Sequence, residues 1–502
     1  MPGPAPTRSP SISTGVPGLD EVLHGGLPAN HLYLVQGSPG VGKTTLALQF
    51  LIEGARRGEP GLYISLSESE DEIRLVAASH GWSLDGVTLA EFTASEGLNA
   101  SEGYTLFSPA EVELGEVMRA LLAEVERTQP ARVVFDSLSE VRLLAQHSLR
   151  YRREILALKQ YFAGSKRTVL LLDDLTAEPD DGQLQSLAHG VISLEQRTTS
   201  YGAERRRLRV VKLRGASYRG GYHDFSVETG GVQVYPRLVA ARSDKQVVDG
   251  TLPSGVGRLD ELLGGGLDRG ASLLVMGPSG SGKSSVAAQF ASAALSRGER
   301  AFVFVFDESE ATLLARSEKL GMGLQEHAAE GLLTVRQVDP AEISPGEFVK
   351  AVCDSVEVDG ARVVIIDSLN GLMHAMPDEK ALVVQLHELM TWLRYRGVTS
   401  VMVAAQHGLL GSAMTTNVDV SYLADVVLLL RYFEAGGRVR NAISVVKRRT
   451  GDHERTIREF AMGPSGLHVG RPLEAFRGVL TGVPTYVGGG DPLLAEEGHG
   501  AE

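Results

Sequence analysis

The strongest constraint on the fold of this chain is an internal repeat. The stretch TGVPGLDEVLHGGLP begins at Thr14, and the related stretch SGVGRLDELLGGGLD begins at Ser254, which is an offset of 240 residues. The same offset persists as far as Glu68 and Glu308, and the later stretch VVKLRG recurs as VVKRRT with an offset of 235 residues. Chance does not sustain such a register. Because 502 residues are too many for one compact core, we predict two copies of one domain in tandem.

The repeat also sets the domain boundaries that we expect. We place the first copy at residues 12–240 and the second copy at residues 241–487, with a polar linker near 236–250. Residues 1–11 are rich in proline, and residues 488–502 are glycine-rich and acidic. We therefore expect a disordered N-terminus and a flexible acidic tail.

Within each copy, short apolar runs alternate with stretches of helical pattern, such as those near 43–55 and 150–163 in the first copy. Uninterrupted apolar strands separated by helices predict an α/β fold with a mostly parallel sheet that is covered by helices on both faces. The runs that we expect to form strands are 32–35, 62–66, 132–135 and 168–172 in the first copy, and 273–275, 301–306, 362–366 and 400–404 in the second.

Each copy contains one match to the phosphate-loop motif G-x-x-x-x-G-K-[ST], placed between a predicted strand and a predicted helix. In this motif the glycines let backbone N–H groups face phosphate oxygens, and the N-terminus of the helix adds positive potential. The lysine reaches the β- and γ-phosphates, and the last hydroxyl binds Mg²⁺. We therefore expect ATP and Mg²⁺ as cofactors, with Thr44 and Ser284 as metal ligands. The residues that we assign to nucleotide binding are Gly37, Ser38, Pro39, Gly40, Val41, Gly42, Lys43, Thr44 and Thr45, and Gly277, Pro278, Ser279, Gly280, Ser281, Gly282, Lys283, Ser284 and Ser285.

Two acids, Asp136 and Asp367, each follow a predicted buried strand and precede a serine. An acid in this position holds Mg²⁺ through its water shell in many phosphate-loop enzymes, so both are candidate metal residues. The alternative is a helix N-cap, since an aspartate and a serine after a strand also suit that role. We favour the metal role because each copy supplies a phosphate loop.

Three further acids follow the second predicted strand of a copy, namely Glu68 in the first copy and Asp307 and Glu308 in the second. They are candidate catalytic residues that would orient or deprotonate the attacking water. The alternative is an acidic first turn of the next helix, where the helix dipole favours negative charge. Because the second copy has two acids and the first has Ser67-Glu68, we expect the second to hydrolyse ATP at least as fast.

Composition limits the classes of partner. The formal net charge of −13 argues against broad attraction to nucleic acid, and we interpret the basic run at 205–209 as a solvated strand or hairpin edge rather than a nucleic-acid patch. No apolar run reaches the length of a membrane span, and the single cysteine, Cys353, excludes an intrachain disulfide. The N-terminus lacks the apolar segment of a signal peptide, so we expect a cytoplasmic protein.

The combined motifs resemble the KaiC family. They comprise the duplicated GVPGLDE and GVGRLDE stretches, the two phosphate loops, the SESE and DESE runs, and the late KLRG and KRRT motifs. KaiC is the ATPase and autokinase of the cyanobacterial circadian clock and has many bacterial relatives. The resemblance covers about residues 12–487. It implies a double-ring homo-hexamer of RecA-like domains with ATP between subunits, and regulatory partner proteins.

The resemblance also implies roles for single residues. Family catalysis uses a paired Glu-Glu, of which the first is the base; here those positions are Ser67-Glu68 and Asp307-Glu308, so the first copy lacks the first acid. A lysine and an arginine of the neighbouring subunit reach the γ-phosphate, where they would neutralise developing charge. Exposed residues on a strand are the alternative. The nucleotide contacts implied in this way are Ser79, Lys212, Leu213, Arg214, Lys447, Arg448 and Arg449.

The family phosphorylates an adjacent serine and threonine in its second domain. Here Ser421 matches the serine and Tyr422 the threonine, so we expect Ser421 to be the acceptor; an ordinary surface or capping serine is the alternative. The family's C-terminal tail is matched only as far as GVPTYV, which argues against a cyanobacterial-type clock partnership. We therefore predict a KaiC-like signalling ATPase with serine autokinase activity. A RecA-like DNA recombination or repair ATPase and an ATP-gated scaffold with little turnover are the alternatives.

Overall fold

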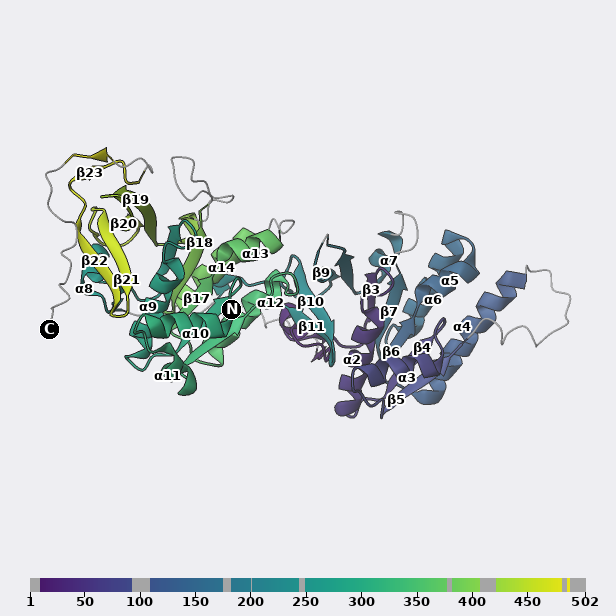
Figure 1. Cartoon of the computed structure of the whole chain (residues 1–502). Coiled ribbons are helices and arrows are strands. Elements are labelled where there is room, and N and C mark those ends of the chain that lie inside the picture. Colours follow the sequence, from purple (N-terminus) through teal and green to yellow (C-terminus); the bar gives the residue numbers. More distant parts are fainter. Residues whose placement is uncertain are drawn as a thin grey trace, which may run out of the picture. The chain divides into compact units, whose positions relative to one another are not determined.

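The structure is a computed structural model that describes residues 10–92, 109–174, 182–199, 201–242, 249–376, 382–406, 421–480 and 485–487. The chain divides into two compact units, with the division between Arg237 and Leu238 (Figure 1). Among these described residues, each unit contains one nine-stranded sheet. The two sequence copies therefore form two separate folded units, which are described in turn.

The sheet of the first unit contains β3 (Leu32–Gly37), β4 (Gly61–Ser65), β5 (Val87–Glu91), β6 (Arg132–Asp136), β7 (Thr168–Asp174), β8 (Gly190–Arg197), β9 (Arg205–Leu213), β10 (His223–Glu228) and β11 (Gly231–Tyr235). Its strand order is β11-β10-β9-β8-β3-β7-β6-β4-β5. The strands from β8 to β5 in this order are parallel, whereas β9, β10 and β11 extend the sheet in antiparallel fashion. A short ribbon of β1 (Ser11–Ile12) and β2 (Leu27–Pro28) precedes the sheet.

The helices of the first unit are α1 (Leu19–Val22), α2 (Lys43–Arg56), α3 (Glu70–Ser79), α4 (Pro109–Thr128), α5 (Leu138–Ala145), α6 (Ser148–Phe162) and α7 (Gly182–Leu187). Tyr33 and Val35 of β3 share a hydrophobic core with α2 and α3, whereas Leu32 and Leu34 share a second core with α4, α5 and α6. The sheet is thus covered on both faces, which explains why the sequence of β3 is uninterruptedly apolar over these residues.

The sheet of the second unit contains β14 (Ser272–Gly277), β15 (Ala301–Val305), β16 (Leu333–Gln337), β17 (Val363–Asp367), β18 (Thr399–Ala405), β19 (Val426–Ala435), β20 (Arg438–Arg448), β21 (Arg458–Gly463) and β22 (Gly466–Pro472). Its order, β16-β15-β17-β18-β14-β19-β20-β21-β22, is that of the first sheet. Two ribbons accompany it, one of β12 (Thr251–Leu252) and β13 (Leu267–Asp268), the other of β23 (Phe476–Arg477) and β24 (Thr485–Tyr486).

The helices of the second unit are α8 (Gly257–Leu262), α9 (Lys283–Leu295), α10 (Glu310–Lys319), α11 (Leu324–Ala329), α12 (Pro345–Glu357), α13 (Leu369–Ala375) and α14 (Leu382–Tyr395), with short 3-10 turns η2 (Ala240–Arg242) and η3 (Ser421–Leu423). Leu273 and Val275 pack with α9, α10 and α11, whereas Leu274 and Met276 pack with α12, α13 and α14. Within the described ranges, no helix combines the length and apolar character that crossing a membrane requires.

The predicted fold class is confirmed, because each unit is a mostly parallel sheet with helices on both faces. The basic run at 205–209 forms a strand, as expected, but its expected position at an edge needs a correction. It lies on β9, which pairs with β8 on one side and β10 on the other, so it is not at an edge. Two of its arginines have carboxylate partners, with Arg207 lying 2.7 Å from Glu195 and Arg206 lying 3.2 Å from Glu204.

Candidate active site

The phosphate loop of the first copy connects the carboxyl end of β3 to the start of α2. Gly42, at the N-cap of α2, has a φ of 110°, a left-handed conformation that favours glycine. The Lys43 ammonium donates hydrogen bonds to the carbonyl oxygens of Gly37 at 2.8 Å and Ser38 at 3.0 Å. The loop therefore wraps around the buried end of the lysine, at the N-terminus of a helix that favours anions.

The phosphate loop of the second copy has the same form between β14 and α9. The Lys283 ammonium donates to the carbonyl oxygen of Pro278 at 2.8 Å, and burial lowers the pKa of Lys283. Ser281 donates to the same carbonyl at 2.8 Å, and the hydroxyl of Tyr432 on β19 donates to the carbonyl of Ser279 at 3.1 Å. These bonds fix the loop against the sheet.

Asp136 ends β6 beside the first phosphate loop. Its Oδ2 atom accepts a hydrogen bond from the Thr44 hydroxyl at 3.0 Å and another from the buried hydroxyl of Tyr63. Burial raises the pKa of Asp136, and these two hydrogen bonds oppose the rise. Ser137, not Asp136, occupies the N-cap position of α5, so Asp136 is not the capping residue. Adjacent hydroxyl and carboxylate oxygens are ligands that suit Mg²⁺.

Asp367 ends β17 in the same way in the second copy. It accepts a hydrogen bond from Ser284, while burial and then the charge of Glu308 raise the pKa of Asp367 to about 6. The capping residue of α13 is Ser368, whose hydroxyl accepts from the N–H of Gly371. Ser284 and Asp367 thus repeat the pair of hard oxygen donors found in the first copy.

Glu68 lies between β4 and α3, before the N-cap Ser69, so it is not in the first turn of the helix. It is half-buried, and burial together with the charge of Asp136 raises the pKa of Glu68. Its Oε2 atom is buried and has no hydrogen-bond partner among the residues that the structure describes. An orphaned carboxylate oxygen beside Asp136 fits a site that receives water, metal or nucleotide.

Asp307 and Glu308 lie at the matching place in the second copy, before Ser309, the N-cap of α10. Both oxygens of Glu308 accept hydrogen bonds from Arg316, at 2.5 and 2.7 Å. Asp307 instead accepts a hydrogen bond from the Ser368 hydroxyl at 2.6 Å. The two acids therefore have different partners, and Glu308 is held in a bidentate ion pair with Arg316.

Lys212 and Arg214 lie at the opposite end of the strands from the phosphate loop of their own copy. Lys212 pairs with Val191 at the start of β8, and Gly190 of β8 pairs with Tyr33 at the start of β3. The phosphate loop follows the other end of β3, which is six residues long. At about 3.3 Å per residue, the two ends of that strand are roughly 20 Å apart. These cations do not reach the phosphate loop of their own copy.

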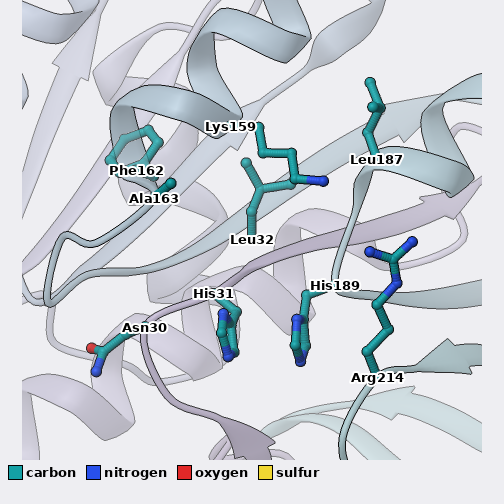
Figure 2. Close-up of a pocket in the computed structure, with 9 residues that line it drawn as sticks. All are labelled: Asn30, His31, Leu32, Lys159, Phe162, Ala163, Leu187, His189 and Arg214. Atoms are coloured by element: carbon teal, nitrogen blue, oxygen red, sulfur yellow. The ribbon is translucent and has the colours of Figure 1, made fainter.

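Figure 2 shows the surroundings of Arg214 at this end of the strands. The rings of His31 and His189, which directly precede β3 and β8, are stacked with their centroids 3.7 Å apart. Arg214 donates to the carbonyl of Ser186 at 3.0 Å. Arg214, the two histidines and Lys159 of α6 line one pocket. This end of the strands is thus rich in positively charged and imidazole side chains.

The second copy repeats this placement. Lys447 pairs with Val427 at the start of β19, which is parallel to β14, so it too lies away from its own phosphate loop. Its ammonium donates to the carbonyl oxygens of Ser421 at 2.7 Å and Ala424 at 2.9 Å. Arg449 donates to the carbonyl of Tyr422 at 2.8 Å. The segment 415–420, which precedes Ser421, lies outside the described residues.

Three of the residues expected to contact nucleotide make contacts within their own unit. The Arg448 side chain is 4% exposed and donates to Asp268 at 3.0 Å and to the carbonyl of Gly266 at 3.1 Å. Leu213, at the corresponding place, is buried in the core of its own unit. Ser79 is exposed at the end of α3, where its hydroxyl donates to the carbonyl of Val76 at 2.7 Å. The alternation of side chains along a strand explains why Arg448 and Leu213 turn inward.

A family model described as the KaiC ATPase matches residues 12–239 and 252–474. The chain belongs to the KaiC family. The circadian clock protein KaiC3 of Synechocystis sp. is 26% identical over 483 residues, which cover 95% of this chain and 94% of that protein. The circadian clock oscillator protein KaiC of Synechococcus elongatus is 28% identical over 489 residues, covering 95% of this chain and 92% of that protein. The KaiC of Acaryochloris marina is also 28% identical, over 485 residues, with coverage of 95% and 91%.

Membership of the KaiC family establishes a duplicated, ATP-binding phosphate-loop ATPase. Sequence reasoning missed two residues of its first site. Asp174, at the end of β7, lies 2.6 Å from the Lys43 ammonium, and Tyr63 donates to Asp136. A signal for Asp174 was present, because the two acids Asp173 and Asp174 follow the apolar run 168–172, much as Asp136 follows its own run. No comparable signal marks Tyr63, whose hydroxyl is hidden within an apolar strand.

Proposed function

We propose that this KaiC-family ATPase hydrolyses Mg-ATP in both copies, assembles as a hexameric ring with ATP between subunits, and phosphorylates Ser421. The observation that carries the proposal is the position of the basic pairs, Lys212 with Arg214 and Lys447 with Arg449. Both pairs lie at the end of the strands opposite to their own phosphate loop. If these cations neutralise a γ-phosphate, that phosphate belongs to another subunit.

The residues of each site divide the work. Lys43 and Lys283 bind the β- and γ-phosphates, while Thr44 with Asp136 and Ser284 with Asp367 hold Mg²⁺. Mg²⁺ supplies neutralisation of the phosphate charge when it is bound. In each copy, a candidate catalytic carboxylate beside the phosphate loop holds a water molecule in line with the γ-phosphorus and takes the proton that the water loses.

Ser421 lies beside the basic pair of the second copy, since its carbonyl oxygen accepts from Lys447. A nucleotide that is bound against Lys447 and Arg449 would therefore approach Ser421 from the neighbouring subunit. The relatives named as circadian clock proteins suggest a regulatory output through partner proteins, which we propose for this chain in the cytoplasm. Nothing in this proposal requires nucleic acid or a membrane.

Assembly is the property that tests the proposal. We expect light scattering to give a mass that rises about sixfold when Mg-ATP is added to the wild-type protein, because ligand held between subunits stabilises the closed ring. A variant with Lys212, Arg214, Lys447 and Arg449 all changed to alanine should remain at low mass and hydrolyse ATP slowly, yet still bind nucleotide at its own phosphate loops.

The control is Arg209→Ala, which removes an exposed cation from the same strand β9. This variant should assemble like the wild type. Normal assembly and hydrolysis by the fourfold variant would contradict the placement of ATP between subunits. A wild-type protein that stays monomeric with saturating Mg-ATP would contradict the ring itself.

A further inference from the structure

Asp174, the last residue of β7, lies in the candidate active site of the first copy, beside Lys43. Its carboxylate lies 2.6 Å from the Lys43 ammonium, and it accepts hydrogen bonds from Ser139 at 2.9 Å and Ser137 at 3.2 Å. Asp174 also acts electrostatically on Glu68 and Asp136. It therefore belongs to the group of charges around the lysine of the phosphate loop.

The second copy has no acid at this place. Gly37 pairs with Asp174 across β3 and β7, and Gly277 pairs with Ala405 across β14 and β18, so Ala405 is the equivalent residue. The acid that the second copy has instead is Asp307, where the first copy has Ser67. Each copy thus has one carboxylate that the other lacks.

The two carboxylates accept hydrogen bonds from equivalent serines of the two copies. Ser368 directly follows Asp367 and donates to Asp307 at 2.6 Å, whereas Ser137 directly follows Asp136 and donates to Asp174 at 3.2 Å. The sheet order explains how this occurs, because β6 lies between β7 and β4, and β17 lies between β18 and β15. The serine after the central strand is therefore reached by an acid from one neighbouring strand in the first copy and from the other in the second.

A steric difference accompanies the exchange. In the second copy, a Cβ atom on Gly371 would lie 2.8 Å from Oδ1 of Asp307, so that acid requires a glycine there. The first copy has Glu140 at the equivalent position, three residues after the serine. A side chain at that position crowds the place that Asp307 takes, and the first copy has Ser67 in place of the acid.

We propose that Asp174 is the catalytic carboxylate of the first copy and takes the role of the acid missing at Ser67. The proposal rests on ATP hydrolysis by the first copy, as put forward above. When the Lys43 ammonium binds the phosphates, it exchanges its contact with Asp174 for one with the γ-phosphate. The carboxylate then lies at the γ-phosphate end of the site, with a water molecule between the two anions.

The reaction step is a simple hydrolysis. The oxygen of the water forms a bond to the γ-phosphorus, and the bond from the γ-phosphorus to the bridging oxygen breaks, with its electron pair leaving on ADP. Asp174 holds the water in line and accepts the proton that it loses, and later releases it to solvent. Ser137 and Ser139 keep the carboxylate oriented through their hydrogen bonds.

The test uses the full chain with Lys283→Ala, so that only the first copy can turn over. In that parent, Asp174→Asn should lower kcat by about 10²–10⁴-fold, the usual contribution of a general base. ATP should still bind, because asparagine does not compete with phosphate for Lys43. Glu68→Gln, made in the same parent, should have the smaller effect.

Rescue supplies the sharper arm of the experiment. Asp174→Ala combined with Ser67→Asp and Glu140→Gly gives the first copy the arrangement of the second, and it should recover hydrolysis that Asp174→Ala alone loses. A merely structural role for Asp174 would not be rescued from a different strand.

The outcomes separate this inference from the proposed function. An Asp174→Asn variant that hydrolyses ATP at the rate of its parent overturns the role of Asp174 alone. So does a variant that fails only because ATP no longer binds. If the Lys283→Ala parent itself shows no hydrolysis while the Lys43→Ala variant does, hydrolysis by the first copy and the role of Asp174 are both overturned, which favours an ATP-gated scaffold for that copy.

Discussion

At the scale of single residues, the two acids proposed to hold Mg²⁺ differ in their hydrogen-bond partners. Asp136 receives hydrogen bonds from Thr44 and from Tyr63 of β4. The register of the sheet places Val303 at the position of Tyr63 in the second copy, so Asp367 lacks a tyrosine there. Burial raises the pKa of Tyr63 further above its usual range, so the hydroxyl stays protonated and acts as a donor. Tyr63 is thus a positioning residue for Asp136.

We predict that Tyr63→Phe raises the Mg²⁺ concentration needed for ATP binding at the first copy by about 10–100-fold. This is the usual loss of metal affinity when an outer partner of a metal ligand is removed. Phenylalanine keeps the ring in the core, so the fold should persist. The measurement is an Mg²⁺ titration of nucleotide binding in the Lys283→Ala chain. Tyr33→Phe is the control, because it removes a buried hydroxyl that donates to Pro28 instead. Equal Mg²⁺ requirements for both variants would contradict the role of Tyr63.

The two acids after β15 are also predicted to differ in function. Asp307 faces Ser368, while Glu308 forms a bidentate pair with Arg316. In a Lys43→Ala chain, we expect Asp307→Asn to reduce the rate of hydrolysis by about 10²–10⁴-fold. Glu308→Gln should change the rate much less, because that carboxylate is already occupied. Steady-state ATPase assays compare the two variants, and the reverse order of effects would identify Glu308 as the base.

This comparison bears on the ranking of the two copies. The sequence expectation that the second copy is at least as active rested on its two acids. With Glu308 engaged by Arg316 and Asp174 present in the first copy, each copy has one carboxylate at its serine. The ranking stays a prediction, and the single-site chains described above measure it directly.

At the scale of elements, apolar runs predicted the central strands and the site residues that follow them. Strands buried on both faces leave a continuous apolar signal, and the phosphate loops, Asp136 and Asp367 follow directly from strand ends. The antiparallel strands β9 and β10 gave no such signal, because charged and apolar residues mix along them. Asp174 was missed for a different reason. Its importance depends on which strands are neighbours in space, and that order differs from the order in sequence.

The starts of β3 and β8 carry a titratable element, the stacked pair of His31 and His189. Burial lowers the pKa of both imidazoles below the usual 6.5. A depressed histidine pKa contributes stability that is fully present above 6.5 and is lost as the pH falls below it, because the unfolded chain then binds more protons. The charges of His31, Arg214 and Lys212 add to the effect of burial on His189 and lower its pKa, whereas a hydrogen bond with the backbone of Arg214 raises it.

We therefore predict that the first unit unfolds at a lower temperature as the pH falls below 6.5, and that replacing both histidines with asparagine flattens this dependence. Trp82 reports on the first unit when Trp392 is changed to phenylalanine, so the Tm can be followed by its fluorescence. Part of the slope should persist, because burial also lowers the pKa of His223 in the same unit, to about 4. An unchanged slope in the double variant would remove the pair as its source.

At the scale of the whole molecule, the placement of the basic pairs and Ser421 favours the proposed transfer of phosphate between subunits. The second phosphate loop and Ser421 of one chain lie at opposite ends of the strands of the same sheet. Ser421 begins η3, which lies shortly before the start of β19, and β19 runs parallel to β14, whose other end leads into the phosphate loop. Phosphate transfer within one copy would have to span the length of these strands. Transfer between neighbours in a ring brings the donor edge of one subunit to the acceptor edge of the next.

The last prediction is that Ser421 is phosphorylated by a neighbouring chain and that Tyr422 is not. Lys283→Ala cannot bind the donor ATP in its second copy, and Ser421→Ala cannot accept phosphate, so neither variant alone should gain phosphate on residues 421–425. Mixed rings of the two should gain it, and only on chains that carry Lys283→Ala, which phosphopeptide mapping identifies. Tyr422→Phe should leave the yield unchanged, because a tyrosine hydroxyl lies too far from the backbone for the same in-line approach. The new charge of roughly −1.5 to −2 would lie beside Lys447 and Arg449, which hold the backbone of Ser421 and Tyr422, and would draw them from those carbonyls. Mixed rings that hydrolyse ATP but stay unphosphorylated, while the wild type is phosphorylated, would require transfer within one chain; an unphosphorylated wild type would leave an ATPase without the kinase.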